Sequence, residues 1–389
     1  MTINVKTTSR SSGYASKIML PLACLGLSTA AQALELDVGD SEVSIYGFAQ
    51  LDAAYTDGPD MYAASGFTPF FDIRPRDVEG SDGDFDMGAY TSRIGLLSAT
   101  PTKNGPIRVV IEGDFHENGG PGFRLRHAYG EWNGILAGQT WTNFSGFVGL
   151  TKTIDFTGPV GRPNPGRLAQ IRYTLNGFSA ALEDPDGFSV GEGILSGTSG
   201  VNQSRVPNFT LRYTQSVDAF TYEFGGLGRE VGYEVSNEDD YAFGWGINAS
   251  ASYRFGTGIK LRGAVAHGDG IGGYLFFNPG GAGYVKADGK VETIKATSAT
   301  TGISIPAGTG AFNLSYAMVQ ADMDDTAELN PAPPNIYGYD RYDSVFLNYI
   351  WSPIEPISYG IEVGHHRAEQ PSGESNDITR LQGMVRYTF

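Results

Sequence analysis

Cysteine is nearly absent from this chain: Cys24 is the only one among 389 residues. A single cysteine excludes an internal disulfide, so an exported protein of this sequence needs another source of stability. Long apolar runs are also missing beyond residue 33, which excludes membrane helices there. Basic residues are scarce, 27 against 43 acidic ones, and the formal charge is −16. We expect no nucleic-acid partner, because nucleic acids are bound by basic surfaces.

The chain is rich in glycine and aromatic residues instead, with 54 glycines and 12% aromatics. Charged and apolar residues alternate along it. Between residues 107 and 115, one face of a predicted strand carries Arg108, Glu112 and Asp114, and the other carries Val109, Ile111 and Phe115. In a soluble sheet the apolar face is the core, whereas in a transmembrane barrel it meets lipid and the charged face lines a wet lumen. The alternation alone leaves both structures open.

The first 33 residues have the pattern of a secretory signal peptide. They hold three basic residues and no acidic one, then an apolar run over 18–27, then the A-x-A cleavage site Ala31-Gln32-Ala33. We predict cleavage after Ala33, which removes Cys24 and leaves residues 34–389 as one barrel domain. A lipoprotein cysteine is the weaker alternative, because Cys24 lies midway through the apolar run.

The chain ends in an alternating strand with a terminal aromatic residue. Counting back from Phe389, apolar or small residues (Tyr387, Val385, Gly383 and Leu381) alternate with polar ones (Thr388, Arg386, Gln382 and Arg380). This pattern looks like the end of a bacterial outer-membrane barrel. A soluble secreted solenoid or sandwich fits the composition as well, but it does not explain this last strand.

Alternation and turn residues predict about sixteen strands. Their approximate ranges are 43–55, 90–100, 107–115, 123–132, 135–141, 168–174, 178–183, 208–214, 220–228, 241–255, 259–267, 291–305, 312–320, 342–351, 357–365 and 378–389. Long and short connections alternate, and Asn-Gly pairs such as Asn133-Gly134 mark short hairpins. We therefore predict an all-β fold, a 16-stranded antiparallel transmembrane β-barrel in the bacterial outer membrane. The facing of strand 291–305 stays open, because neither of its faces is clearly apolar.

Counting faces from the last strand assigns many charged residues to the lumen. The basic ones are Arg93, Arg108, Arg124, Arg126, Arg172, Arg212, Arg254, Lys260, Arg262, Arg380 and Arg386, and the acidic ones are Asp52, Glu112, Asp114, Glu183, Glu223 and Glu362. A barrel of this size leaves a water-filled channel unless it is plugged. Arginines in a narrow pore favour anions, and their planar fork matches carboxylates.

Part of this set is expected to line the pore and select the solute. It comprises Arg93, Arg108, Arg124, Arg126, Arg172, Arg212, Lys260, Arg262, Glu112 and Asp114. A single bulge would swap the faces of a whole strand.

The connection over residues 142–166 is the expected constriction. We predict that this third extracellular loop folds into the barrel and narrows it, as in general porins; an exposed surface loop is the alternative. Its candidate site residues are Phe144, Phe147, Lys152, Asp155 and Arg162, with Arg167 just after it. Lys152, Arg162 and Arg167 are expected to face the arginines of the wall or the solute, and Asp155 to pair with that wall.

His127 has outward parity in the middle of its strand, where a polar residue facing lipid is costly. We predict that it contacts a neighbouring subunit, which implies a homotrimer with an interface over the first five strands. A bulge that turns His127 inward is the alternative.

The motifs of residues 92–174 allow a family comparison. They are Ser92-Arg93-Ile94-Gly95, Ile111-Glu112-Gly113-Asp114-Phe115, Arg124-Leu125-Arg126-His127-Ala128-Tyr129-Gly130-Glu131-Trp132, Ala137-Gly138-Gln139-Thr140-Trp141 and Gln170-Ile171-Arg172-Tyr173-Thr174. The chain resembles the DcaP-like outer-membrane porins, also in Ile350-Trp351-Ser352-Pro353 and the final strand. The resemblance implies a trimeric sixteen-stranded porin favouring dicarboxylates and other small anions. Some members carry an N-terminal coiled coil, for which residues 34–40 leave no room.

Other site motifs fail. Asp82, Asp84 and Asp86 alternate like calcium ligands, but Met87 stands where an EF-hand needs glycine. Loose divalent binding by the acidic loops stays open. The glycines of residues 268–273 lack the spacing and the βαβ unit of a dinucleotide site. We expect no cofactor and no metal site.

The chain is thus predicted to be a diffusion porin for small hydrophilic solutes, with outer-membrane lipids, lipopolysaccharide and small anions as partners. Two alternatives remain. One is a barrel enzyme of the lipase or protease type, although nothing marks out a nucleophilic serine. The other is a cation-preferring pore set by its acidic loops. The Debye length of about 8 Å at physiological salt favours the constriction over the loops.

Overall fold

The computed structural model describes residues 34–58, 73, 83–117, 120–163, 166–187, 193–196, 200–235, 238–323 and 338–389. The expected signal peptide, residues 1–33, lies outside this part. No helix in the described ranges is long and apolar enough to cross a membrane.

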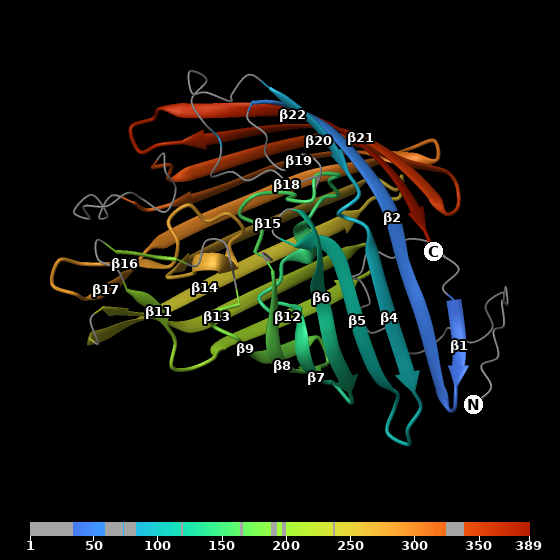
Figure 1. Cartoon of the computed structure of the whole chain (residues 1–389), viewed down its shortest axis with the longest axis horizontal. Helices are drawn as coiled ribbons and strands as arrows, with labels where there is room; N and C mark the ends of the chain where they lie inside the picture. The colour runs from blue at the N-terminus through green and yellow to red at the C-terminus, as the bar shows by residue number, and fades with distance from the viewer. Residues whose placement is uncertain are drawn as a thin grey trace.

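Sixteen antiparallel strands form a closed barrel (Figure 1). Closure is made by the first and last barrel strands, which pair with Leu51 opposite Val385. The strands are β2 (Ser41–Asp57), β4 (Arg93–Thr100), β5 (Ile107–Glu117), β6 (Gly120–Trp132), β7 (Ile135–Trp141), β8 (Arg167–Leu175), β9 (Phe178–Glu183), β12 (Asn208–Val217), β13 (Phe220–Val235), β14 (Glu238–Arg254), β15 (Lys260–Asp269), β18 (Lys295–Ala307), β19 (Gly310–Ala321), β20 (Arg341–Ile354), β21 (Ile357–Glu369) and β22 (Ser375–Thr388). The predicted fold class is confirmed.

Short strands add to the barrel or pair apart from it. β1 (Leu34–Val38) pairs with the start of β2, and β3 (Asp84–Gly88) and β11 (Val201–Gln203) pair with β2 and β13. β10 (Ile194–Leu195), β16 (Gly283–Val285) and β17 (Val291–Thr293) form a separate three-stranded sheet. The strand expected over 291–305 is therefore wrong at its start, because its first three residues belong to that sheet.

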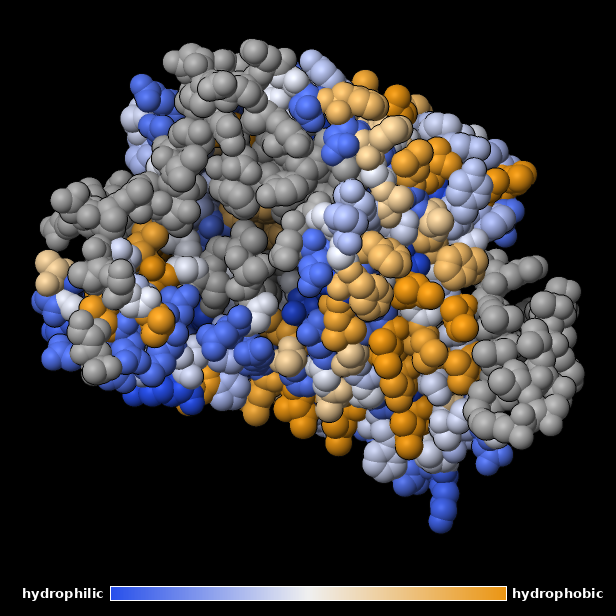
Figure 2. Space-filling view, in the orientation of Figure 1, coloured by the Kyte–Doolittle hydropathy of each residue, from blue (hydrophilic) through white to orange (hydrophobic). Residues whose placement is uncertain are grey.

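The alternation follows the lipid–lumen pattern that the sequence predicted. Outward Leu51, Ile111 and Leu381 are 46%, 50% and 49% exposed, whereas inward Asp52 and Glu112 are at most 1% exposed. Figure 2 shows apolar side chains gathered over the outer face of the front strands, with hydrophilic residues at the end that carries β11. Such a surface is stable where lipid covers it.

At the end where β1 and the C-terminus lie, every connection between barrel strands is a short turn, whereas the long connections such as 142–166 lie at the other end (Figure 1). Asn133 and Asn176 adopt positive φ and are followed by Gly134 and Gly177, also at positive φ. This is the type I′ geometry that Asn-Gly favours, and it fixes the hairpin register. Because outer-membrane barrels place short turns in the periplasm, this end is the periplasmic mouth.

Two connections fill part of the barrel interior. One is the third long connection, residues 142–166, and the other is the segment 270–285, which is buried throughout. Ile271, Tyr274 and Phe277 form an apolar core with inward residues of the wall such as Leu227 and Val319. The sequence analysis predicted only a connection between the strands 259–267 and 291–305, so this second inserted segment was not foreseen. Its insertion leaves the free space beside the arginine-rich strands.

Candidate functional site

Two buried carboxylates of the barrel wall hold the loop 142–166 inside the lumen. Glu183 on β9 accepts hydrogen bonds from the Thr142 hydroxyl, 2.8 Å away, and from the backbone N–H of Asn143. Glu362 on β21 accepts the backbone N–H groups of Ile154 and Asp155, at 2.8 and 2.7 Å. The expected inward folding of this loop is confirmed. Backbone donors that leave water need such acceptors, and a carboxylate is a strong one.

Glycines allow the loop to lie directly on the wall. A Cβ atom at Gly149 would come within 2.4 Å of the Gly263 carbonyl oxygen on β15. At Gly302 on β18, a Cβ atom would meet Thr151 of the loop, with its Cβ 2.9 Å away. Further along, the loop joins the second inserted segment: the Gly161 N–H donates to the Phe276 carbonyl at 2.7 Å. The loop is thereby fixed between the wall and the apolar core.

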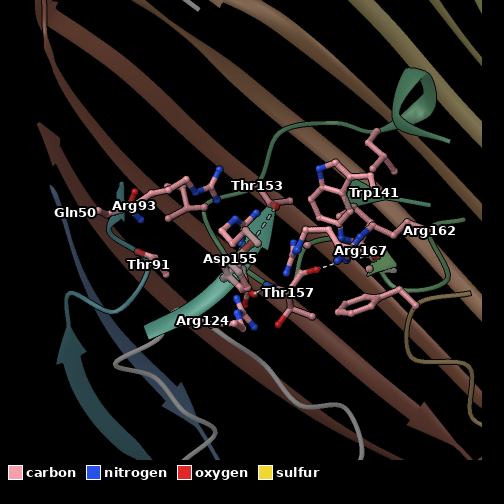
Figure 3. A pocket seen from close by; sticks show the side chains of 18 of the residues that line it. Gln50, Thr91, Arg93, Arg124, Trp141, Thr153, Asp155, Thr157, Arg162 and Arg167 are labelled. Atoms are coloured by element: carbon pink, nitrogen blue, oxygen red, sulfur yellow. Dashed lines mark hydrogen bonds between the residues drawn. The ribbon is translucent and has the colours of Figure 1, made fainter. Parts of the chain in front are cut away.

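A cavity of about 610 Å³ remains between the loop and the strands β2, β4, β6 to β8 and β22 (Figure 3). Its lining includes six arginines and one carboxylate, Asp155. The arginines are Arg93, Arg124, Arg126, Arg162, Arg167 and Arg386. The cavity is therefore strongly electropositive.

Three of these arginines are matched by two buried acids of β5. Arg124 makes a bidentate pair with Asp114, at 3.0 and 2.8 Å. Arg126 bridges Asp114 and Glu112, at 2.7 and 3.0 Å, and Arg93 lies 3.4 Å from Glu112. Charge-assisted bonds of this kind fix the guanidinium planes. Three positive charges on two negative ones still leave an excess.

Each cavity arginine also lies over an aromatic ring. Arg386 and Arg93 lie 4.2 and 5.3 Å from the Phe48 centroid. Arg124 and Arg126 lie 5.5 and 5.7 Å from Phe156 of the loop. Arg167 lies 4.6 Å from Trp141, and Arg162 lies 3.6 Å from Phe276. Stacking holds a guanidinium by its face and leaves its N–H edge available.

Arg167 and Arg386 differ from the matched arginines of β4 and β6, because neither forms an ion pair with any residue in the described ranges. Arg386 donates from Nε to Gln50 at 2.6 Å, a neutral acceptor. Within the described ranges, neither charge is therefore matched by a carboxylate in direct contact.

Comparison with known proteins identifies the family at this point. Residues 26–280 match the family described as DcaP outer membrane protein. The chain belongs to the DcaP outer membrane protein family. This DcaP-family protein is an outer-membrane channel of the porin type.

Solved structures show the same fold. The outer membrane channel DcaP of Acinetobacter baumannii is 22% identical, with a TM-score of 0.77 over 91% of this chain and 99% of that chain. An anion-selective porin from Comamonas acidovorans is 17% identical, with a TM-score of 0.55 over 90% and 100%. The trimer form of OmpT, an outer membrane protein of Vibrio cholerae, is 11% identical, with a TM-score of 0.53 over 90% and 99%. No curated protein is similar enough to count as a match.

The predicted site residues divide into those at the cavity and those elsewhere. Arg93, Arg124, Arg126, Asp155, Arg162 and Arg167 line it. Asp155 does not pair with the arginines of β4 to β8 as expected; its carboxylate lies 3.7 Å from Arg380 on β22. Glu112 and Asp114 lie behind the arginines as their counter-ions.

Other predicted residues face the lumen away from the cavity lining. Arg108 lies opposite Glu131, Arg172 bonds to Gln170, and Arg212 lies 3.8 Å from Glu223. Lys260 and Arg262 lie on β15 below the loop. In the loop itself, Phe144 packs on Tyr274 and Phe147 on Trp141, with centroids 5.6 and 5.1 Å apart, so both are anchors of the loop.

The outward parity assigned to His127 is wrong, because β6 contains a bulge. Glu112 of β5 lies opposite His127, and the next residue, Gly113, lies opposite Leu125. Arg126 and His127 therefore both turn inward, which is the effect of one extra residue in a strand. His127 is 3% exposed, and its Nδ1 lies 3.0 Å from the Thr140 hydroxyl. Its parity no longer supports a subunit contact.

Sequence reasoning missed the aromatic half of the site, which consists of Phe48, Phe156 and Phe276. For Phe276 a signal existed, since the apolar run Tyr274-Leu275-Phe276-Phe277 is unusual in a loop exposed to water. Phe48 and Phe156 gave no comparable signal, because single aromatic residues occur throughout a barrel.

Proposed function

We propose that this porin is a passive diffusion channel that favours small anions, dicarboxylates in particular. The observation that carries the proposal is the composition of the cavity, six arginines against one aspartate. Arginine side chains in a narrow pore raise the local concentration of anions and lower that of cations. The anion-selective porin with the same fold agrees with this preference.

Dicarboxylates fit Arg167 and Arg386, the two arginines shown above to form no ion pair with the described residues. Arg167 comes from β8 and Arg386 from β22, on separate parts of the lining. Each can offer a planar pair of N–H groups to one carboxylate. A volume of about 610 Å³ is within the range of small-ligand sites.

Reversal potentials in a KCl gradient across planar bilayers test the proposal. We expect an anion-selective potential for the native channel and a several-fold lower anion-to-cation permeability ratio for the double variant R167Q/R386Q. One unit charge about 8 Å from a permeating ion, at an effective dielectric constant of about 40, changes the ion's energy by about 1 kcal/mol.

The matched control is R205Q. Arg205 is 55% exposed and pairs with Glu230 at the extracellular end. This variant removes the same charge outside the lumen and should leave the ratio unchanged. A cation-selective potential in the native channel contradicts the proposal.

A cation-preferring pore is the second candidate. Glu238, Asp239 and Asp240 lie at the extracellular end of β14, and Glu238 and Asp239 are exposed. If these residues set the preference, cation selectivity should grow as salt is lowered, because the Debye length increases to about 30 Å at 0.01 M. If the cavity sets it, anion selectivity should persist at low salt.

We also propose that the protein is a homotrimer in contact with outer-membrane lipids and lipopolysaccharide. The trimer form of OmpT has the same fold and supports this. Native mass spectrometry of the protein extracted from the outer membrane tests the oligomeric state, and a monomer contradicts it. Cleavage after Ala33 stays a prediction, which N-terminal sequencing of the same sample tests.

A further inference from the structure

Three cations adjoin one another on the inward face of β14 and β15. Lys260 lies directly opposite Arg254, and Arg262 is two residues further along the same strand. Leu261 between them points outward and is 43% exposed, so Lys260 and Arg262 share the lumen face. Like charges at opposed positions of adjacent strands destabilise a sheet.

This exit cluster (Arg254, Lys260 and Arg262, with Lys152 of the loop) has no acidic counterpart among the described residues. None of its four members forms an ion pair there, although Arg262 donates to the Ser304 hydroxyl at 2.8 Å. The arginines of β4 and β6 are different, since Glu112 and Asp114 match them. The charge of the exit cluster is therefore available to a solute.

Lys152 joins the cluster because of the close approach of the loop to the wall. Gly149 lies against Gly263, the residue after Arg262, and Thr151 lies against Gly302. Gly302 is itself opposite Arg262 in the β15–β18 register. The Lys152 backbone is fixed by Asn348, whose Nδ2 donates to the Lys152 carbonyl at 2.9 Å. Arg262 and Arg386 are positive charges that act electrostatically on Lys152.

The position of the exit cluster along the pore follows from the turns. Arg254 and Lys260 flank the short turn 255–259, at the periplasmic mouth. Thr151, the residue before Lys152, lines the cavity, so Lys152 lies at the end of the cluster next to the cavity. The basic residues therefore continue from the cavity towards the periplasm.

We propose that the exit cluster is a second anion site, which holds small dianions such as dicarboxylates after they leave the cavity. The proposal rests on the anion preference argued above. With a second site next to the cavity, a dianion passes from the cavity to the periplasmic water in two short steps and not in one long one. Binding at each site has to be weak enough for the ion to leave.

The test uses succinate as the probe and single-channel current recordings in planar bilayers. The orientation of each channel is fixed by biotin on K103C, in the exposed turn 101–106, with streptavidin added to one side. Succinate added on the periplasmic side should give short current blocks whose rate depends weakly on voltage, as expected for a shallow site. The variant R254Q/K260Q/R262Q should shorten these blocks by about fivefold or more.

The variant R167Q/R386Q separates the two proposals. It should keep the shallow blocks and lose deeper, voltage-dependent ones. If the exit-cluster variant behaves like the native channel while R167Q/R386Q changes, the exit site is wrong and the proposed function stands. If succinate blocks neither channel, both proposals fail. Unchanged conductance in 1 M KCl, where the Debye length is about 3 Å, shows that a variant is correctly folded.

Discussion

The Glu362 carboxylate of β21 accepts the backbone N–H of Asp155 at 2.7 Å, so a buried wall residue holds the middle of the constriction loop. The same carboxylate accepts the Ile154 N–H at 2.8 Å and the Asn348 amide at 2.7 Å. The Asp155 side chain lies 3.7 Å from Arg380 of β22. The position of the loop therefore depends on an acceptor that lies 207 residues further along the chain.

Replacing Glu362 by glutamine should loosen the loop. Glutamine has one acceptor oxygen, and its NH2 group would face a backbone N–H that it cannot accept. Leaving one buried donor unpaired costs about 1–3 kcal/mol. We expect E362Q to raise the low-frequency noise of the open-channel current, because the loop visits more positions.

The control for this experiment is E369Q on the same strand. Glu369 is 30% exposed and pairs with Arg367 near the end of β21. It should have the native noise level. Quiet currents from E362Q would show that Glu362 does not hold the loop.

Phe156 fills the space between the loop and the arginine wall. Its ring stacks on His116 with centroids 4.9 Å apart and lies 5.5 Å from the Arg124 guanidinium. F156A should increase conductance and weaken anion selectivity, since it widens the cavity and frees two guanidinium groups. F156L keeps most of the volume and loses only the cation–π contact, worth about 0.5–1 kcal/mol each at exposed sites.

Conductance and reversal potential, measured on both variants, separate size from positioning. A selectivity loss in F156A that F156L does not share assigns the effect to size. Equal losses assign it to the contact with the arginines. Native selectivity in both variants contradicts a role for Phe156.

The sequence predicted the barrel well because a transmembrane sheet has strict alternation. In β22, for example, Leu381 and Arg380 have opposite environments set only by parity, and their exposed fractions are 49% and 2%. The same parity rule assigned Arg93, Arg124 and Arg126 to the lumen, where all three line the cavity. Parity is a local property, so one sequence suffices to read it.

Features that depend on contacts between distant segments could not be read in this way. The bulge at His127 results from the pairing of β6 with β5, and no residue type in the sequence of β6 predicts it. The insertion of residues 270–285 depends on the apolar core that Tyr274 and Phe277 build with the wall. The Asp155 carboxylate lies next to Arg380 and does not pair with the arginines of β6, because Glu362 holds the backbone of the loop at this point.

Gly149 should be essential for the position of the loop. The Cβ of G149A would lie 2.4 Å from the Gly263 carbonyl, and backbone atoms at this distance must move. Overpacking of this kind typically costs about 1–3 kcal/mol. We expect a broader distribution of single-channel conductances. The control G130A places its Cβ 3.8 Å from the nearest atom, in ordinary contact, and a broadening equal to that of G149A would contradict the argument.

The charge of Lys152 should make the anion preference depend on pH. Burial lowers the pKa of Lys152 below its ordinary value, and the positive charges of Arg262 and Arg386 lower it further. Since a lysine is charged only below its pKa, Lys152 loses its charge at a lower pH than a lysine in water. The anion-to-cation permeability ratio should therefore fall as the pH rises through a range that begins below the usual lysine titration.

Reversal potentials measured from neutral to alkaline pH check this prediction. K152R should reduce the fall, because arginine stays charged over the whole range. K152Q should show the low anion-to-cation permeability ratio already at neutral pH. Residue 152 should then contribute no further change as the pH rises. The other lysine near the site, Lys260, also titrates, and K260R run in parallel measures its share. A fall that persists unchanged in K152R would assign the titration to another group and contradict the role of Lys152.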